Sequence, residues 1–237
     1  MLVFDPMPVT ALQVWLRAQA FVWLAGCIAL PWVVHESWWA VGFAVVAGLS
    51  YFALVVILRA GRGLADVVTI ARFGMLTMLV VETRTAFDVV WWGVALIAVL
   101  LDLVDGAIAR RRGGSPEGAV LDMETDQFTV LVLASLVVQH GGGVHVLVLP
   151  ALRYAFVLAM WAVGAPAHDP KPVNGDNRRG KRICAAVMVA LLVALWPGGN
   201  TTLRDVTTLI AVLLLAWSFT ADARFLVARV RRRAVAG

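Results

Sequence analysis

The sequence is poor in the residues that build disulfide-linked and zinc-binding domains. It contains only two cysteines, Cys27 and Cys184, and both lie inside apolar segments. Two isolated cysteines form neither a disulfide framework nor a metal-ligand spacing, so we expect each to pack in the core. The first ten residues contain no Lys or Arg, and we therefore do not expect the basic n-region of a cleaved signal peptide. No polar linker is long enough to separate two domains, which favours a single bundle.

Apolar residues, in contrast, are abundant. They make up 61% of the chain, against about 45–50% in an ordinary soluble domain, and the mean hydropathy is +0.86. Long apolar runs recur along the sequence, which predicts an all-α polytopic membrane protein. The net charge of +5 would favour nucleic-acid binding in a soluble protein. Here the cations lie in short connections beside apolar segments, so they set the topology and contact membrane lipids, and no nucleic-acid partner is expected.

A membrane-spanning helix needs about 20 mostly apolar residues, and by this rule the sequence predicts about eight transmembrane helices. The predicted crossings are 11–34, 38–58, 67–81, 89–110, 116–138, 144–163, 183–196 and 206–227. Basic residues gather after the second, fourth, sixth and eighth crossings. This alternation places both termini and the even-numbered connections in the cytoplasm, and we expect the bacterial inner (plasma) membrane as the location.

The connection between the fourth and fifth crossings is short and turns the chain back on itself. Gly113 and Gly114 supply the turn, and Ser115 is a favourable N-cap for the next helix. Pro116 suits the first helical position, and Glu117 suits the positive end of the helix macrodipole. The two crossings are therefore predicted to be an antiparallel pair whose connection lies on the cytoplasmic side.

Four aspartates lie in this antiparallel pair, although membrane helices normally exclude carboxylates. Asp102 and Asp105 are three residues apart, and Asp122 and Asp126 are four apart. On helices these spacings put each pair on one face, and the tight connection lets the two faces meet. At ~1.5 Å per residue, both pairs are expected at similar depth, roughly 10 Å or less below the cytoplasmic end.

Four converging carboxylates repel one another, and a bound cation would remove this repulsion. Carboxylates are hard oxygen ligands that suit Mg²⁺, Mn²⁺ or Ca²⁺, and no His or Cys lies nearby to favour zinc. Four carboxylates suffice for two divalent ions, an arrangement that stabilises the attacking and leaving oxygens in phosphoryl transfer. The structural alternative is ion pairing with the three arginines of the connection, Arg110, Arg111 and Arg112.

The same residues form a motif that resembles the signature of the CDP-alcohol phosphotransferase family, DxxDGxxAR followed by GxxxDxxxD. Its fixed positions are Asp102, Asp105, Gly106, Ala109, Arg110, Gly118, Asp122 and Asp126. The spacer between the halves has seven residues, one fewer than the usual form of the family, which changes the loop more than the helix faces. An upstream NxxTxxR signature of the family resembles Asp66, Thr69 and Arg72, with Asp in place of Asn.

This resemblance implies a six-helix catalytic core at 64–237, preceded by an N-terminal pair of helices at 1–63. It also implies an enzyme of phospholipid biosynthesis that moves a phosphatidyl or similar group from a CDP-linked donor, such as CDP-diacylglycerol, to an alcohol and releases CMP. The implied ligands of two divalent cations, Mg²⁺ or Mn²⁺, are Asp102, Asp105, Asp122 and Asp126, and Asp126 is also the implied general base. The implied nucleotide-binding residues are Asp66, Thr69, Gly106, Ala109, Arg110 and Gly118.

Basic residues beyond the aspartates are candidates for binding the acceptor. Arg153 lies within the sixth crossing, and Arg179, Lys181 and Arg182 precede the seventh. Such cations bind anionic groups, so the sequence favours a polyol phosphate such as glycerol phosphate. The structural alternatives are snorkelling or an ion pair with a core aspartate for Arg153, and a positive-inside loop for the others. Gln127 stands where we associate an Arg with inositol-phosphate users, which disfavours that acceptor.

Two other functions are compatible with the sequence. The first is the same transfer to an uncharged or amino alcohol. The second is a membrane scaffold or small transporter whose aspartates bind ions without catalysis. Release of CMP separates the enzymes from the scaffold, and a panel of acceptors separates the two enzymes. A homodimer, which is common in the family, is also compatible with the sequence.

Overall fold

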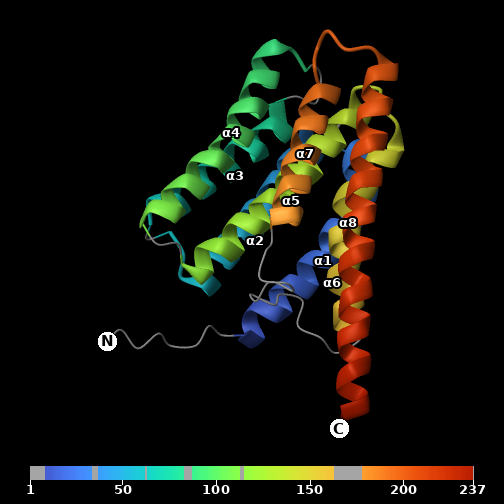
Figure 1. Ribbon diagram of the computed structural model, residues 1–237. Helices are drawn as coiled ribbons and strands as arrows, with labels where there is room; N and C mark the ends of the chain where they lie inside the picture. Colours follow the sequence, from blue (N-terminus) through green and yellow to red (C-terminus); the bar gives the residue numbers. More distant parts are fainter. Residues whose placement is uncertain are drawn as a thin grey trace.

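The computed structural model describes residues 9–33, 37–61, 63–82, 87–112, 115–162 and 178–236. Within these ranges the chain forms eight α-helices and one short 3-10 helix and contains no strand, which confirms the predicted all-α fold (Figure 1). The elements are α1 (Val9–Val33), α2 (Ser37–Leu58), α3 (Leu64–Glu82), α4 (Val89–Arg112), α5 (Pro116–Gln139), the 3-10 helix η1 (Val144–Leu147), α6 (Val148–Ala162), α7 (Arg178–Ala194) and α8 (Thr201–Ala236).

Each predicted crossing corresponds to one helix, and the largest differences lie in the C-terminal half. α8 begins at Thr201 and continues well beyond the predicted end at residue 227, so that it projects past the other helices (Figure 1). The sixth crossing begins as η1, which follows a turn in which Gly141 has a φ of 88°. Residues other than glycine rarely adopt this conformation, and the turn therefore separates α5 from η1.

Among the described residues, five helices are long and apolar enough to cross a membrane, namely α1, α2, α3, α4 and α8. α6 and the apolar part of α7 are shorter, and α5 carries Asp122, Glu124 and Asp126 in its first half. In its second half, every residue from Phe128 to Val137 is buried. The chain is thus an integral membrane protein in which protein surrounds the acidic helix, and acidic groups cost less there than in contact with lipid.

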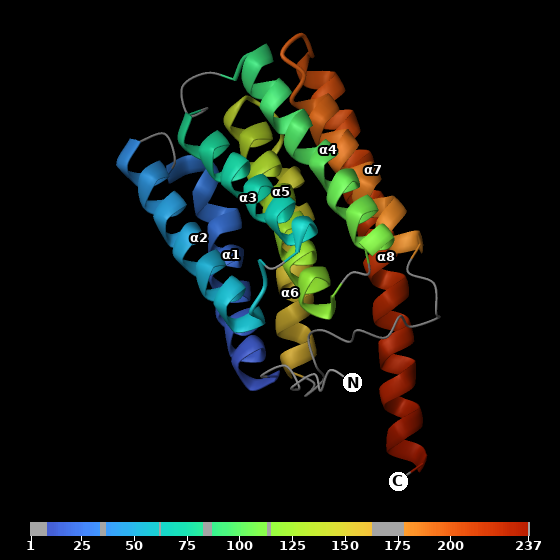
Figure 2. The same cartoon turned by 90° about the vertical axis from the view of Figure 1, so that its left-hand side faces the viewer.

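The helices surround α5. Figure 2 shows α1 and α2 on one side and α7 and α8 on the other, with α3 and α5 between them. α3 packs against both α4 and α5, and α7 packs along α8. This arrangement brings the start of α5 next to α3 and α4, which carry the other residues of the predicted site.

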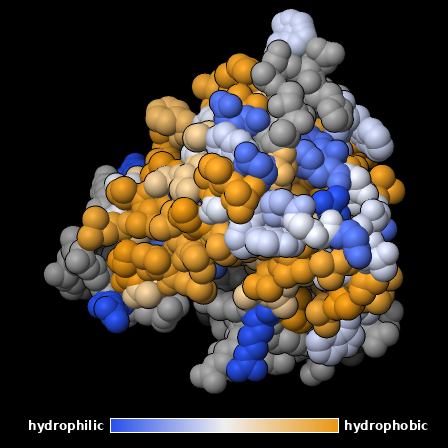
Figure 3. All heavy atoms as spheres, turned by 90° about the horizontal axis from the view of Figure 1, so that it is seen from above, coloured by the Kyte–Doolittle hydropathy of each residue, from blue (hydrophilic) through white to orange (hydrophobic). Residues whose placement is uncertain are grey.

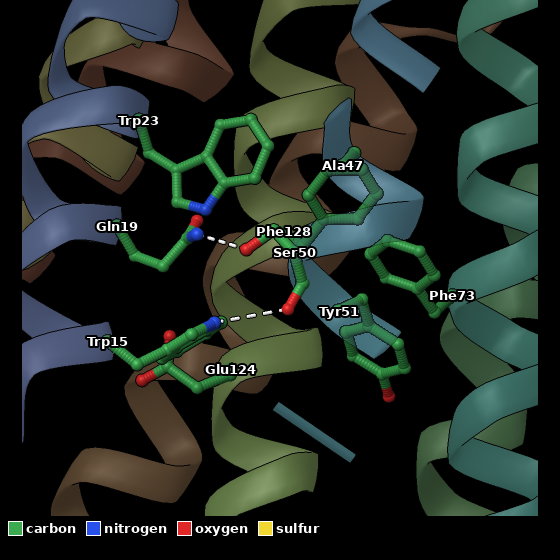
Figure 4. Close-up of a pocket in the computed structure, with 9 residues that line it drawn as sticks. All are labelled: Trp15, Gln19, Trp23, Ala47, Ser50, Tyr51, Phe73, Glu124 and Phe128. Carbon is green, nitrogen blue, oxygen red and sulfur yellow. Dashed lines mark hydrogen bonds between the residues drawn. The ribbon is translucent and has the colours of Figure 1, made fainter. Parts of the chain in front are cut away.

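The N-terminal pair of helices is part of the same bundle. α1 packs against α6 and α5, and α2 packs against α3. Gln19 of α1 donates a hydrogen bond to the Ser50 hydroxyl of α2, and the Trp15 indole donates to the Ser50 carbonyl at 3.1 Å (Figure 4). Trp23 contacts Phe128 of α5, with ring centroids 5.8 Å apart. The division of the chain at residue 63 stays a prediction.

The outer surface of the bundle is mainly apolar. On α2, the side chains of Trp38, Leu49 and Phe52 are each 66% exposed. Seen from the end that holds the α3–α4 and α7–α8 connections, hydrophobic side chains make up much of the described periphery (Figure 3). Such a surface suits lipid rather than water. α2 and α4 end, and α3 and α5 begin, at the opposite end of the bundle (Figure 1), in agreement with the predicted alternation, while the cytoplasmic orientation stays a prediction.

Candidate active site

The four aspartates of the motif converge between α3, α4 and α5. Asp102 and Asp105 project from α4, and Asp122 and Asp126 project from α5. Carboxylate oxygens of Asp102, Asp105 and Asp122 all lie within 4.8 Å of one another. Side-chain exposure rises from 3% at Asp105 to 39% at Asp122, so the cluster is buried at one end and accessible at the other.

The local sequence positions the α5 half of this cluster. Ser115 is the N-cap of α5, as predicted, and its hydroxyl accepts a hydrogen bond from the Gly118 amide at 2.9 Å. Pro116 occupies the first turn, where its missing N–H is no loss. The helix is therefore well formed from its first residue, and Asp122 follows within two turns.

Arg72 of α3 lies at the centre of the cluster. Its side chain is completely buried, and it forms ion pairs with all four aspartates. Its Nη1 atom lies 2.9 Å from Asp102, 3.3 Å from Asp105 and 3.4 Å from Asp122, and its Nη2 atom contacts Asp126. The sequence identified Arg72 as part of a family signature but named the arginines after α4 as possible counterions. The sequence did contain a signal for this role of Arg72. An arginine within a membrane helix needs an anionic partner, and Arg72 lies in the apolar segment that precedes the aspartates.

One guanidinium leaves the four carboxylates with an excess of negative charge. Oδ1 of Asp105 is buried and has no hydrogen-bond partner within the described structure. A buried carboxylate oxygen without a donor is costly, and a cation beside it would satisfy it. The donor set consists of hard carboxylate oxygens, which suit Mg²⁺ or Mn²⁺. The residues present therefore fit a site for divalent cations.

Thr69 supports the cluster from α3. Its hydroxyl donates to Oδ2 of Asp105, with 2.9 Å between the oxygens, and it also lies 3.0 Å from the carbonyl of Ala65 on the preceding turn. Because Thr69 is itself buried, this contact fixes the orientation of the Asp105 carboxylate. The residue that was predicted to bind nucleotide thus has a clear role in holding a carboxylate.

Asp66 connects the starts of α3 and α5. Its Oδ2 atom accepts hydrogen bonds from the amides of Gly61 and Gly63, at 3.0 and 3.5 Å. A Cβ atom at Gly118 would lie 2.7 Å from Oδ1 of Asp66, which is closer than real Cβ contacts allow. Glycine at position 118 is therefore what lets Asp66 approach α5. The sequence named both residues but gave no sign that they meet.

The remaining candidates for nucleotide binding lie on α4. Gly106 and Ala109 are half-buried and follow Asp102 by four and seven residues, so they continue the same helix face. Small side chains on this face let a ligand approach the helix backbone closely. The side chain of Arg110 lies outside the described part of the structure.

Arg153, a predicted acceptor residue, lies on the other side of α5. It lines a cavity of about 240 Å³ between α5, α6, α7 and α8, and its Nη2 atom lies 3.4 Å from Oε1 of Glu124. The expected structural alternative was a pair with a core aspartate, whereas the partner is a glutamate. Arg182 is exposed and is not among the described lining residues. The side chains of Arg179 and Lys181 lie outside the described residues.

Sequence reasoning missed Glu124. It lies between Asp122 and Asp126 on α5, and it is almost fully buried. The signal for its role was the presence of one further acid in an apolar helix together with one arginine, Arg153, in the next apolar helix. Two such charges are expected to pair in a membrane protein, because neither is tolerated alone.

Fold and site together define a polytopic helical membrane protein with an acidic cluster inside the bundle. A family model described as CDP-alcohol phosphatidyltransferase matches residues 62–220. The chain therefore belongs to the CDP-alcohol phosphatidyltransferase family, which confirms the resemblance seen in the motif. The family consists of phosphotransferases that use a CDP-alcohol donor and an alcohol acceptor in a membrane, typically with a divalent cation. No curated protein and no solved structure matched the chain.

The matched segment begins just before α3 and ends within α8. It contains all eight fixed positions of the motif, together with Arg72 and Arg153. α1 and α2 lie before it, although they pack against helices of the matched segment. The transferase assignment thus rests on the helices that carry the aspartates.

Proposed function

We propose that this enzyme transfers the phosphatidyl group of CDP-diacylglycerol to the hydroxyl group of an alcohol and releases CMP, as a step of phospholipid biosynthesis. The observation that carries the proposal is the convergence of four motif aspartates around Arg72 in a member of this family. The cluster opens at Asp122, which lies within two turns of the start of α5. This position suits a donor with a polar nucleotide and lipid tails, because the tails stay beside the apolar surface.

In the proposed reaction the acceptor oxygen attacks the phosphatidyl phosphorus. The bond from this phosphorus to the bridging oxygen breaks, and CMP leaves with the bonding electrons. The hydroxyl proton passes to the carboxylate of Asp126, which acts as general base. The ion pair with Arg72 holds that carboxylate in the cluster. Asp102, Asp105, Asp122 and Asp126 would hold two Mg²⁺ or Mn²⁺ ions, which when bound neutralise the diphosphate and the leaving CMP.

The nucleotide of the donor is assigned to the residues around the starts of α3 and α5 and to one face of α4. The proposed residues are Asp66, Thr69, Gly106, Ala109, Arg110 and Gly118. The contact between Asp66 and Gly118 supports this assignment, because it brings a polar side chain and a glycine together at the starts of α3 and α5. Glycine and alanine let a ligand approach the helix backbone closely.

The acceptor is assigned to the cavity beside Arg153. Met123 and Gln127 of α5 line this cavity, and each directly follows an aspartate of the cluster. One residue on an α-helix corresponds to a rotation of about 100°, so the cavity and the aspartates occupy neighbouring stripes of α5. Its volume of about 240 Å³ is below the usual ~300–1,000 Å³ of pockets for drug-sized ligands, which suits a small alcohol.

The proposal is tested with purified protein in lipid nanodiscs, CDP-diacylglycerol, a panel of alcohols and either Mg²⁺ or Mn²⁺. CMP and a new phospholipid are expected together with at least one alcohol, and neither is expected with a chelator. Folded protein that binds divalent cations but forms no CMP with any alcohol would instead identify an ion-binding scaffold or transporter. Homodimer formation stays a prediction that the mass of the detergent-solubilised protein tests.

A further inference from the structure

We propose that Glu124 makes the acceptor cavity selective for alcohols that carry no phosphate group, because it holds the guanidinium of Arg153 in a buried ion pair. This inference rests on the proposed function and specifies its acceptor. It favours the uncharged or amino alcohol over the polyol phosphate that the sequence alone favoured.

The described lining of the cavity contains few polar groups and a single charge. Among the described residues that line it, Arg153 is the only charged one. α7 contributes the uncharged residues Gly180, Ile183, Cys184 and Val187, and the polar groups come from Gln127 of α5 and Ser218 of α8. Amide and hydroxyl groups donate and accept hydrogen bonds, so they suit the hydroxyl groups of an uncharged polyol.

The charge of Arg153 is already compensated. The Glu124 side chain is 8% exposed and that of Arg153 is 12% exposed, and the two atoms of the pair are 3.4 Å apart. The second contact of the Arg153 Nη2 atom is the Met123 sulfur at 3.6 Å, which is a weak acceptor. Glu124 also lines the small cavity between α1, α2, α3 and α5, together with Trp15 and Tyr51 (Figure 4). The glutamate is therefore enclosed by the N-terminal helices on one side and paired with Arg153 on the other.

A phosphate placed against Arg153 would also lie close to Glu124. At such distances two anions repel strongly in a low-dielectric environment, and the arginine would have to be shared between them. The charge balance within the two buried clusters acts in the same direction. The described ion pairs of the two clusters contain five carboxylates and two guanidinium groups. Two bound divalent cations would offset this excess, and the donor diphosphate would make the sum slightly negative again, so a phosphorylated acceptor is disfavoured.

Glu124 acts through Arg153 and is therefore a positioning residue. Its test compares matched pairs of acceptors, glycerol with glycerol 3-phosphate and inositol with inositol phosphate. The Michaelis constant and the turnover number for CMP release are measured for each. The stabilisation of the protein by each acceptor in the absence of donor is measured by thermal unfolding, and this readout needs no turnover.

The variants are Glu124→Gln, which removes the charge, and Glu124→Asp, which keeps it. Glu117→Gln is the matched control, because Glu117 lies on the same helix but outside the pair and the cavity. Wild-type protein is expected to prefer the unphosphorylated member of each pair by about tenfold or more in kcat/KM. Glu124→Gln is expected to shift this ratio toward the phosphorylated member by about tenfold, mainly through KM, whereas Glu124→Asp and Glu117→Gln stay close to wild type.

A wild-type preference for the phosphorylated acceptors overturns the inference, even if Glu124→Gln does not fold. A Glu124→Gln variant that folds and keeps the wild-type ratio overturns it as well. Failure of the proposed function looks different: no acceptor yields CMP. In that case the thermal unfolding measurement still tests the selectivity of the cavity. The inference is supported if only the unphosphorylated alcohols stabilise the wild-type protein and Glu124→Gln loses or reverses this preference. It is contradicted if only the phosphorylated alcohols stabilise the wild-type protein.

Discussion

Two buried charge clusters share α5, and they differ in their balance. The aspartate cluster, formed by Asp102, Asp105, Asp122 and Asp126, surrounds the single cation Arg72. The second cluster is the one-to-one pair of Glu124 and Arg153. The first has an excess of negative charge and is accessible at Asp122, which favours cation binding. The second is neutral as a pair and lies beside a cavity whose other described lining residues are uncharged, which disfavours charged ligands.

The helix itself separates the two clusters. Asp122, Glu124 and Asp126 alternate along α5, and a step of two residues turns a side chain by about 200° around an α-helix. The two aspartates therefore face α3, while Glu124 faces α6 and its arginine. We therefore propose that three acids within five residues have two different roles, one in binding cations and one in setting the charge of a neighbouring cavity.

The largest effect is expected from Asp126→Asn. The substitution keeps the size of the side chain but removes the proposed general base, and general acid–base catalysis typically contributes about 10²–10⁴-fold. CMP release should fall at least that far, while binding of the CDP-linked donor is partly retained. Nearly normal turnover in this variant would exclude Asp126 as the base. Glu117→Gln on the same helix is the control for the loss of an acid outside both clusters.

Arg72→Gln removes the cation at the centre of the aspartate cluster. Breaking a buried ion pair by removal of one partner typically costs about 3–5 kcal/mol, because the remaining charges are uncompensated. In chelator, this variant should unfold at a much lower temperature than wild type. Mg²⁺ or Mn²⁺ should stabilise it more than they stabilise wild type, because the cations replace the missing charge.

Arg72→Lys is the matched variant, because it keeps the charge but loses the forked geometry that contacts several carboxylates. In chelator, its unfolding temperature should lie between those of wild type and Arg72→Gln. If Arg72→Gln is as stable as wild type without divalent cations, Arg72 is not needed to compensate the negative charge of the aspartates.

Gly118→Ala tests whether binding of the CDP-linked donor depends on the close approach of Asp66 to the start of α5. The added Cβ atom would lie 2.7 Å from Oδ1 of Asp66, so the carboxylate must move. We expect affinity for the CDP-linked donor to fall by about tenfold, with a smaller change in the Michaelis constant for the acceptor. The control is Gly74→Ala on α3, where a Cβ atom meets nothing within 4 Å. If the two variants bind the CDP-linked donor with equal affinity, Asp66 does not contribute to nucleotide binding.

The smallest effect is expected from Tyr51→Phe. The Tyr51 hydroxyl lies 2.8 Å from the Thr125 hydroxyl on α5, between the two charge clusters, and its ring stacks on Phe73. Removal of one neutral hydrogen bond within a membrane protein costs about 0.6 kcal/mol on average. A small decrease in stability with unchanged CMP release is therefore expected. A large loss of turnover would show that the N-terminal helices contribute to the site through this contact.

The sequence was sufficient to predict the eight helices and the meeting of the four aspartates. Apolar runs give the helices, and Ser115 and Pro116 give the start of α5, because these signals are local. The aspartates meet because two adjacent helices with a short connection leave little choice of partner face. Local patterns of this kind accounted for the architecture and for the acidic half of the candidate site.

The contacts that balance the charges were not predictable from the sequence. Arg72 reaches the aspartates from α3, Asp66 reaches Gly118 across some fifty residues, and Glu124 reaches Arg153 on α6. Each contact depends on the rotation and depth of one helix relative to another. Helix periodicity gives the face of each helix but not which residue of a neighbouring helix meets it. The partner of a buried charge must therefore be found in the structure.

The central claim is that the aspartate cluster carries out phosphatidyl transfer. Its most direct test is the simultaneous measurement of CMP and new phospholipid formed by wild-type protein from CDP-diacylglycerol and the acceptor panel, with and without chelator. The predicted result is one CMP for each new phospholipid, formed only with a divalent cation and with an alcohol present. Stabilisation by divalent cations without any CMP or new phospholipid would contradict the claim.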